Sequence, residues 1–206
     1  VGMWEEEQIC PGCRRASRYG LLHPGCKSLL VGLTCLWAYE GLTRKLISKI
    51  KYGGYFDYLR EFEILNSKSS LRNSRFASEM NVEMIEFEKF LKQKPVVVPV
   101  PLHKNRLRQR GFNQAELIAS MVARSWMLDT RDLLIRVKDT KQQVGRTREV
   151  RLQSMNNAFA INPKSQDTKN ILLVDDVWTT GATMTEAAKE LKKSGVELVW
   201  GFVLAR

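Results

Sequence analysis

A buried strand that runs directly into two carboxylates and a small turn constrains the fold of this chain more than any other stretch. Residues 171–183 read Ile-Leu-Leu-Val-Asp-Asp-Val-Trp-Thr-Thr-Gly-Ala-Thr. Behind the turn, apolar residues recur at helical spacing, and Gly195 follows them as a C-terminal cap. These apolar positions are Met184, Ala187, Ala188 and Leu191. The order therefore predicts a strand, an acidic pair, a turn and a helix.

The turn has the chemistry of a phosphate site. A helix N-terminus offers unpaired backbone N–H groups and the positive end of a dipole. Gly181 lets the backbone approach a ligand closely, and the threonine hydroxyls add donors. Asp175 and Asp176 can hold ribose hydroxyls directly or through Mg²⁺. The pattern favours a phosphorylated ribose; the alternative is an ordinary strand–turn–helix in which these side chains only cap the helix.

The string Leu-Val-Asp-Asp-Val-x-Thr-Thr-Gly-Ala-Thr closely resembles the phosphoribosyl pyrophosphate (PRPP) binding motif of the type I phosphoribosyltransferases. The resemblance implies that Asp175 and Asp176 contact the ribose at which such enzymes react. It also implies that the following loop holds the 5′-phosphate. That loop comprises Thr179, Thr180, Gly181, Ala182 and Thr183. The motif indicates the superfamily but does not identify the substrate that accepts the phosphoribosyl group.

Cysteines are confined to the N-terminal 35 residues of the chain, at positions 10, 13, 26 and 35. Clustered cysteines outside an oxidising compartment indicate a metal site. Cys10-Pro-Gly-Cys13 is half of a zinc knuckle, and His23-Pro-Gly-Cys26 repeats its spacing. We expect these four residues to bind structural Zn²⁺. Two alternatives stay open: the site has decayed, or Cys35, in an apolar run that favours a buried thiol, replaces His23.

The charge of the 206-residue chain suits a polyanionic partner. It has 33 basic and 22 acidic residues, a formal charge of +11 and a pI near 9.7. A soluble protein with a positive surface would show the same balance. The longest apolar stretch, residues 29–38, is about half of the ~20 residues that a membrane span needs. We therefore expect a cytoplasmic protein without membrane insertion.

The chain divides into a zinc-knuckle module at residues 3–28 and a larger domain at residues 29–206. A polar insert interrupts the larger domain at about residues 66–80. Strand patterns alternate with amphipathic helix patterns, which predicts an α/β fold with a doubly wound parallel sheet. Strands are expected at residues 29–39, 96–98, 133–137, 158–161 and 171–174, and helices at residues 42–50, at 81–93 and from Asn113.

Two basic segments are further candidates for phosphate binding. In the first, basic residues alternate after a strand and could face a pyrophosphate at the sheet edge: Lys104, Arg106, Arg108 and Arg110. The alternative is a solvated charged loop. The second segment, residues 142–159, could close over a diphosphate as a lid through Arg146, with Gly145 permitting the motion. Arginines of this segment could instead bind a strand of nucleic acid.

These segments, in this order, resemble the ComF/GntX family. The resemblance is carried by Val-Pro-Val-Pro-Leu-His-x-x-Arg-Leu-Arg-x-Arg-Gly-Phe-Asn-Gln at residues 98–114, by the second basic segment ending in Ala-Phe, and by the PRPP string. It covers nearly the whole chain apart from the region around the polar insert, and it implies a type I phosphoribosyltransferase-like domain with an N-terminal zinc module. His23 is a departure, because a cysteine is usual there.

The resemblance implies a cytosolic role in natural competence, in which the protein binds PRPP with Mg²⁺ and handles incoming single-stranded DNA. It also implies a helicase-type protein as a possible partner. Two alternatives stay open: an active phosphoribosyltransferase that displaces pyrophosphate, and a PRPP-sensing regulator without DNA binding. No residue stands out as a general base for an acceptor. Among the tryptophans, Trp178 is the best candidate for an exposed base-stacking platform.

Overall fold

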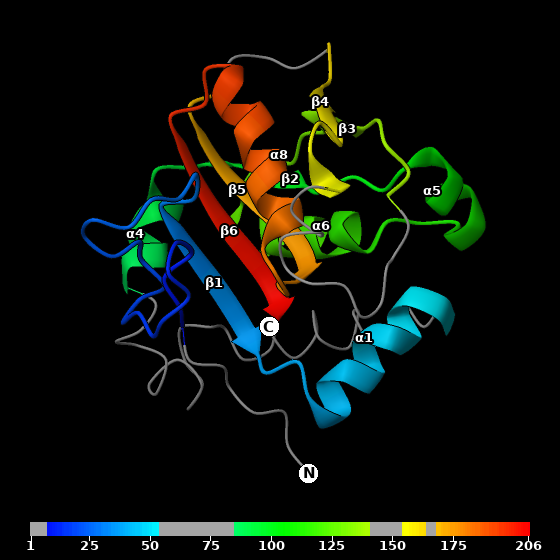
Figure 1. The fold of residues 1–206 in the computed structure, drawn as a ribbon, viewed down its shortest axis with the longest axis horizontal. Helices are drawn as coiled ribbons and strands as arrows, with labels where there is room; N and C mark the ends of the chain where they lie inside the picture. Colours follow the sequence, from blue (N-terminus) through cyan, green and yellow to red (C-terminus); the bar gives the residue numbers. More distant parts are fainter. Residues whose placement is uncertain (1–7, 54–84, 141–153, 164–167) are drawn as a thin grey trace.

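The computed structural model describes residues 8–53, 85–140, 154–163 and 168–206 (Figure 1). The predicted polar insert and the second basic segment with Arg146 lie outside the described residues. No helix in the described part of the chain combines the length and apolar character needed to cross a membrane.

The central element is a four-stranded parallel sheet with the strand order β1-β6-β5-β2. Its strands are β1 (Gly32–Trp37), β6 (Leu198–Ala205), β5 (Asn170–Val177) and β2 (Val96–Pro99). The apolar run of β5 pairs on both sides, with Leu172 opposite Trp200 of β6 and Val97 of β2. β2 is an edge strand and ends at Pro99, a position where a proline is tolerated. The predicted α/β fold with a parallel sheet is confirmed.

Helices cover both faces of this sheet (Figure 1). Because side chains alternate along a strand, Ile171 and Leu173 of β5 pack with α8, whereas Leu172 and Val174 pack with α6 on the other face. The helices are α1 (Gly41–Gly53), α4 (Ile85–Lys92), α5 (Lys104–Arg110), α6 (Gln114–Trp126) and α8 (Ala182–Lys193). The four apolar positions predicted for α8 are all buried, in the same core cluster as Ile171 and Leu173.

Two predicted strands do not join the parallel sheet. β3 (Leu134–Arg136) and β4 (Phe159–Ile161) pair with each other in an antiparallel ribbon. Leu134 and Phe159 are buried in the cluster that contains the α8 residues, so the ribbon packs against the same core as α8. A strand pattern in the sequence does not tell which other strand the segment pairs with. Strands of three residues, such as β3 and β4, carry too little pattern to predict their partner.

The first basic segment forms a helix, α5, in place of the alternating arrangement expected from its sequence. His103 caps its N-terminus, and the His103 Nδ1 accepts a hydrogen bond from the Asn105 N–H at 3.4 Å. Gly111 ends it in a left-handed conformation with φ of 79°. An α-helix turns by about 100° per residue, so successive basic residues, two positions apart, lie about 200° apart and cannot all face one way.

The N-terminal segment lies against β1. The side-chain amide of Gln8 donates to the carbonyl of Cys35 at 2.8 Å and accepts from the Cys35 N–H at 3.0 Å. Ile9 is buried in the same core cluster as the residues of β5 and α8. The segment that carries the knuckle cysteines is therefore anchored to the edge of the sheet.

Candidate functional site

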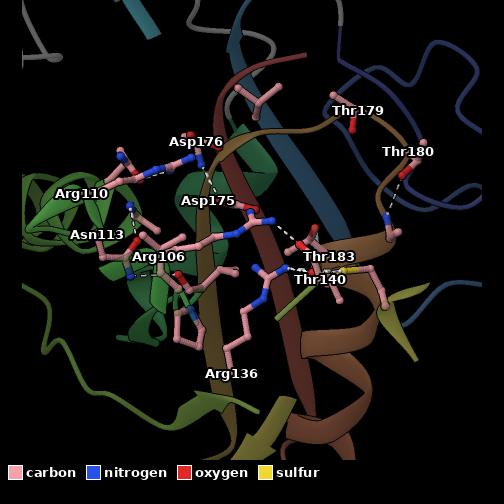
Figure 2. Close-up of a pocket in the computed structure, with 18 of the residues that line it drawn as sticks. Arg106, Arg110, Asn113, Arg136, Thr140, Asp175, Asp176, Thr179, Thr180 and Thr183 are labelled. Atoms are coloured by element: carbon pink, nitrogen blue, oxygen red, sulfur yellow. Dashed lines mark hydrogen bonds between the residues drawn. The ribbon is translucent and has the colours of Figure 1, made fainter. Parts of the chain in front are cut away.

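A pocket of about 460 Å³ opens where the parallel strands end, the usual ligand site of such sheets (Figure 2). Its lining comes from the end of β5, the following turn, the first residues of α8, and from α1, α5, α6 and β3. Several segments that are distant in sequence therefore meet in one cavity.

The acidic pair lies at the end of β5 and lines this pocket. The strand is held there by its pairing with β6, in which Asp175 lies opposite Val203 and Val177 opposite Ala205. Asp175 Oδ1 accepts a hydrogen bond from the Asp176 N–H at 2.8 Å, and both side chains are partly exposed. Carboxylate oxygens at this position are suited to ribose hydroxyls or to a hard cation such as Mg²⁺.

The turn after β5 contributes Thr179, Thr180, Ala182 and Thr183 to the lining, and Figure 2 shows it leading into α8. Thr180 Oγ1 accepts from the Ala182 N–H at 3.4 Å. Gly181 is the N-cap of α8 with φ of 78°, and it is absent from the lining. The turn and the start of the helix therefore face the pocket through Gly181's neighbours.

Trp178 packs beneath this turn. A Cβ on Gly181 would lie 2.4 Å from the Trp178 ring, so the glycine is required by contact as well as by φ. The Trp178 side chain is 3% exposed, and the expectation that it is an exposed stacking platform is wrong. Its indole instead supports the turn from the interior.

The helical geometry of α5 divides its basic residues into two faces. Arg106 and Arg110, four positions apart, line the pocket. Lys104 and Arg108 are exposed and are not among the lining residues. The structure therefore brings two of the four predicted basic residues of this segment to the site, and leaves the other two on the outer face of the helix.

Arg136, on β3, is a pocket residue that sequence patterns did not reveal. Its Nη2 donates to Thr140 Oγ1, and Arg106 donates to the Thr140 carbonyl, so the two guanidinium groups approach the same residue (Figure 2). Burial lowers the pKa of Arg136, neighbouring Arg106 lowers it further, and Asp175 raises it. Its Nε is buried without a partner among the described residues. An arginine inside the apolar stretch 133–137 was the available signal.

Two converging guanidinium groups favour an anion between them. Each arginine offers several N–H donors in a fixed fork, and a bound diphosphate would offset the repulsion between their charges. Arg110 is oriented separately: its Nη1 donates to Gln114 Oε1 at 3.2 Å. The pocket can accordingly accept negative charge at the arginines as well as at the N-terminus of α8.

Asn113 holds together the two ends of the segment that carries Arg106 and Arg110. Its Oδ1 accepts from the Ala115 N–H at 3.1 Å, which confirms the predicted cap of α6. Its Nδ2 donates to the Val100 carbonyl and to Glu116 Oε1, each at 3.1 Å. The buried amide thus fixes the start of α6 to the chain that leaves β2.

A second candidate site lies in the N-terminal segment. The ligand atoms of Cys10, Cys13, His23 and Cys26 all lie within 4.8 Å of one another. Cys13 Sγ is 3.3 Å from His23 Nδ1, and the His23 N–H donates to Cys10 Sγ at 3.3 Å. Three sulfurs and one imidazole are the donor set of a tetrahedral structural zinc site, so this cluster could hold a zinc ion. Cys35 is buried in β1, outside the cluster.

Comparisons with known proteins show the family of the chain. The model of the phosphoribosyl transferase domain matches residues 113–206, which include the acidic pair and the turn. Competence protein F of Haemophilus influenzae is 39% identical over 121 residues, covering 56% of this chain and 52% of that protein. Competence protein ComFC of Bacillus subtilis is 30% identical over 199 residues, covering 91% and 72%.

The DNA utilization protein YhgH of Escherichia coli K12 is 33% identical over 112 residues, covering 53% of this chain and 48% of that protein. The chain thus matches about half the length of the Haemophilus and Escherichia relatives. The match to ComFC, in contrast, extends over most of both sequences. Because it is 30% identical to ComFC over 72% of that protein and contains a phosphoribosyl transferase domain, the chain belongs to the ComF family.

Proposed function

We propose that this protein binds PRPP together with Mg²⁺ in the pocket at the end of β5. The observation that carries the proposal is the composition of one cavity, which combines two carboxylates, a helix N-terminus and four arginines, Arg44 among them. The turn at α8 receives the 5′-phosphate. Asp175 and Asp176 hold the ribose hydroxyls, directly or through Mg²⁺. Arg106, Arg110 and Arg136 receive the pyrophosphate.

The Cys₃His cluster binds a structural zinc ion in this proposal. A small segment with few core residues gains stability from a metal, and the cluster supplies the full complement of four ligands. Metal analysis of the purified protein tests this proposal and should give one zinc ion per chain.

A transfer reaction is the second candidate function. It would break the bond between C1 of PRPP and the pyrophosphate and form a bond to an acceptor nitrogen. Asp175 and Asp176 would stabilise positive charge on the sugar, and the arginines negative charge on the leaving group. However, the lining residues in the described part of the chain include no histidine, lysine or glutamate to activate an acceptor. Pyrophosphate release with a panel of nucleobases tests this second candidate.

The direct test of PRPP binding is isothermal titration calorimetry with PRPP in the presence of Mg²⁺. Asp176→Asn should weaken binding by about tenfold or more, because it removes a charged ligand for the sugar and metal. Asp132→Asn is the matched control, since Asp132 is exposed and does not line the pocket. Absence of heat with the unaltered protein, or equal affinity for both variants, would contradict the proposal.

We also propose that the protein handles single-stranded DNA in the cytosol during natural competence. The support is the family, whose relatives are named competence and DNA utilization proteins, and the charge of +11. Trp37, Trp178 and Trp200 are buried, and Trp126 packs edge-on against Phe87. Contact with the phosphates, more than stacking on these rings, is the expected mode. A helicase-type partner and a sensor role without DNA stay predictions from the resemblance.

A further inference from the structure

The metal cluster and the phosphate turn are joined by one side chain. Arg14 follows Cys13 directly, and its Nη2 donates to the Thr179 carbonyl at 2.7 Å. The two residues are 165 positions apart in sequence. In Figure 2 the N-terminal segment, in dark blue, passes beside Thr179 and Thr180. We propose that Arg14 is a positioning residue through which the zinc cluster fixes the phosphate turn, so that zinc and PRPP bind cooperatively.

The backbone of Arg14 is held by the same loop that presents the metal ligands. The Arg14 N–H donates to the Cys10 carbonyl at 2.8 Å, and the Cys10 N–H donates to the Arg15 carbonyl at 2.9 Å. Arg14 has φ of 65°, a conformation that non-glycine residues adopt only when their surroundings impose it. A metal bound by Cys10 and Cys13 would hold this loop in place. The direction in which the Arg14 side chain leaves the backbone therefore depends on the cluster.

The hydrogen bond acts on the part of the turn that matters for an anion. The peptide bond after Thr179 is trans, so its C=O and the N–H of Thr180 point in opposite directions. Holding the Thr179 carbonyl toward Arg14 therefore directs the Thr180 N–H to the other side of the turn. Thr179 and Thr180 both line the pocket. Arg14 thus orders a backbone donor without occupying the phosphate position itself.

The turn is supported from its inner side as well. Trp178 lies beneath Gly181, and the Trp178 N–H donates to the Ala205 carbonyl at 2.9 Å. The interior contact depends on the sheet, whereas the outer contact with Arg14 depends on the metal segment. Loss of zinc would release only the outer one, which weakens anion binding without unfolding the pocket.

Cooperativity follows from this arrangement. If zinc orders Arg14 and Arg14 orders the turn, zinc raises the affinity for PRPP, and by linkage PRPP raises the affinity for zinc by the same factor. This inference rests on the proposed PRPP site. The experiment therefore changes Arg14 alone and leaves the acidic pair and the pocket arginines intact.

The variant is Arg14→Met, which keeps an unbranched side chain at the same φ and removes the donor. Arg15→Met is the matched control, because Arg15 is the exposed next residue and the charge change is identical. With zinc content verified at one per chain, calorimetry with PRPP and Mg²⁺ should give about tenfold weaker binding for Arg14→Met. Arg15→Met should stay within about twofold of the unaltered protein.

The second readout is zinc affinity with and without saturating PRPP, from competition with a chelator that does not bind Mg²⁺. PRPP should raise zinc affinity in the unaltered protein and in Arg15→Met, and this factor should fall toward one in Arg14→Met. A purely structural Arg14 would leave the factor unchanged. Equal PRPP affinity in all three proteins, an equal loss in both variants, or an unchanged factor would overturn the inference. If the unaltered protein binds no PRPP, the proposed function fails first and the inference fails with it.

Discussion

At Gly181 two independent constraints meet. Its φ of 78° is unfavourable for any residue with a Cβ, and a Cβ would lie 2.4 Å from the Trp178 ring. Gly181→Ala should lower the free energy of unfolding by about 2–4 kcal/mol, the sum of backbone strain and a clash with a buried ring. It should also weaken PRPP binding, because the turn must shift. Urea denaturation and calorimetry measure the two effects.

Gly195 provides the matched control. Its φ is 95°, but nothing lies within 4 Å of a Cβ placed there. Gly195→Ala should therefore lower stability by only about 1 kcal/mol, through backbone strain, and leave PRPP affinity unchanged. Equal losses of stability in the two variants would contradict a specific role for the contact between Trp178 and Gly181.

Site residues could be predicted from the sequence where they are neighbours in the chain. Asp175, Asp176 and the threonines follow one another at the end of a strand, and the structure places them in one pocket. Arg136 was not readable, because it enters the pocket from a strand that precedes Asp175 by 39 residues. The burial of Trp178 is not predictable from the motif, because its position in the sequence does not tell which side of the turn its ring occupies.

At the scale of elements, α5 shows why a helix can escape detection. It has no buried residue, so the apolar periodicity that marks a helix is missing. Its ends are set by His103 and Gly111, which are weak signals when taken alone. The α8 helix, with four apolar residues in the core, could be predicted almost in full. The ribbon of β3 and β4 was missed as a pair because pairing is a tertiary property.

The position of Arg106 and Arg108 on different faces of α5 can be tested by replacing each in turn. Arg106→Ala should reduce PRPP affinity by about tenfold or more, because a guanidinium that lines the pocket is lost. Arg108→Ala, on the exposed side of the same helix, should change it by less than about twofold. Calorimetry with Mg²⁺ compares the two. If both variants lose the same affinity, the segment is not the helix described here when ligand binds.

For the whole molecule, the decisive contacts join segments that sequence reading treats separately. The boundary expected near residue 28 separates a zinc module from a phosphoribosyltransferase-like domain. Across it, Gln8 bonds the backbone of Cys35, Ile9 enters the main core cluster, and Arg14 reaches Thr179. Spacing predicts ligand sets within a segment, but it carries no information on such contacts between segments.

This docking predicts that the N-terminal segment stabilises the whole chain. Gln8→Ala removes two hydrogen bonds to the backbone of buried Cys35, so the free energy of unfolding should fall by about 1–3 kcal/mol. Gln109→Ala, at an exposed position on α5, should have little effect. Urea denaturation followed by tryptophan fluorescence gives both values. Unchanged stability in Gln8→Ala would show that the segment is not anchored through this contact.

The net charge of +11 predicts that single-stranded DNA binds the protein surface mainly through its phosphates. Binding of a labelled oligothymidylate, followed by fluorescence anisotropy, should weaken as salt rises, with a log–log slope of about −0.7 for each phosphate neutralised. Lys104 and Arg108 are exposed outside the pocket, so the double variant Lys104→Ala/Arg108→Ala should make the slope less negative by about 1.4. Its PRPP affinity should not change. An unaltered slope would exclude this face of α5 from DNA binding, and a joint loss of DNA and PRPP binding would instead indicate that both ligands use the pocket.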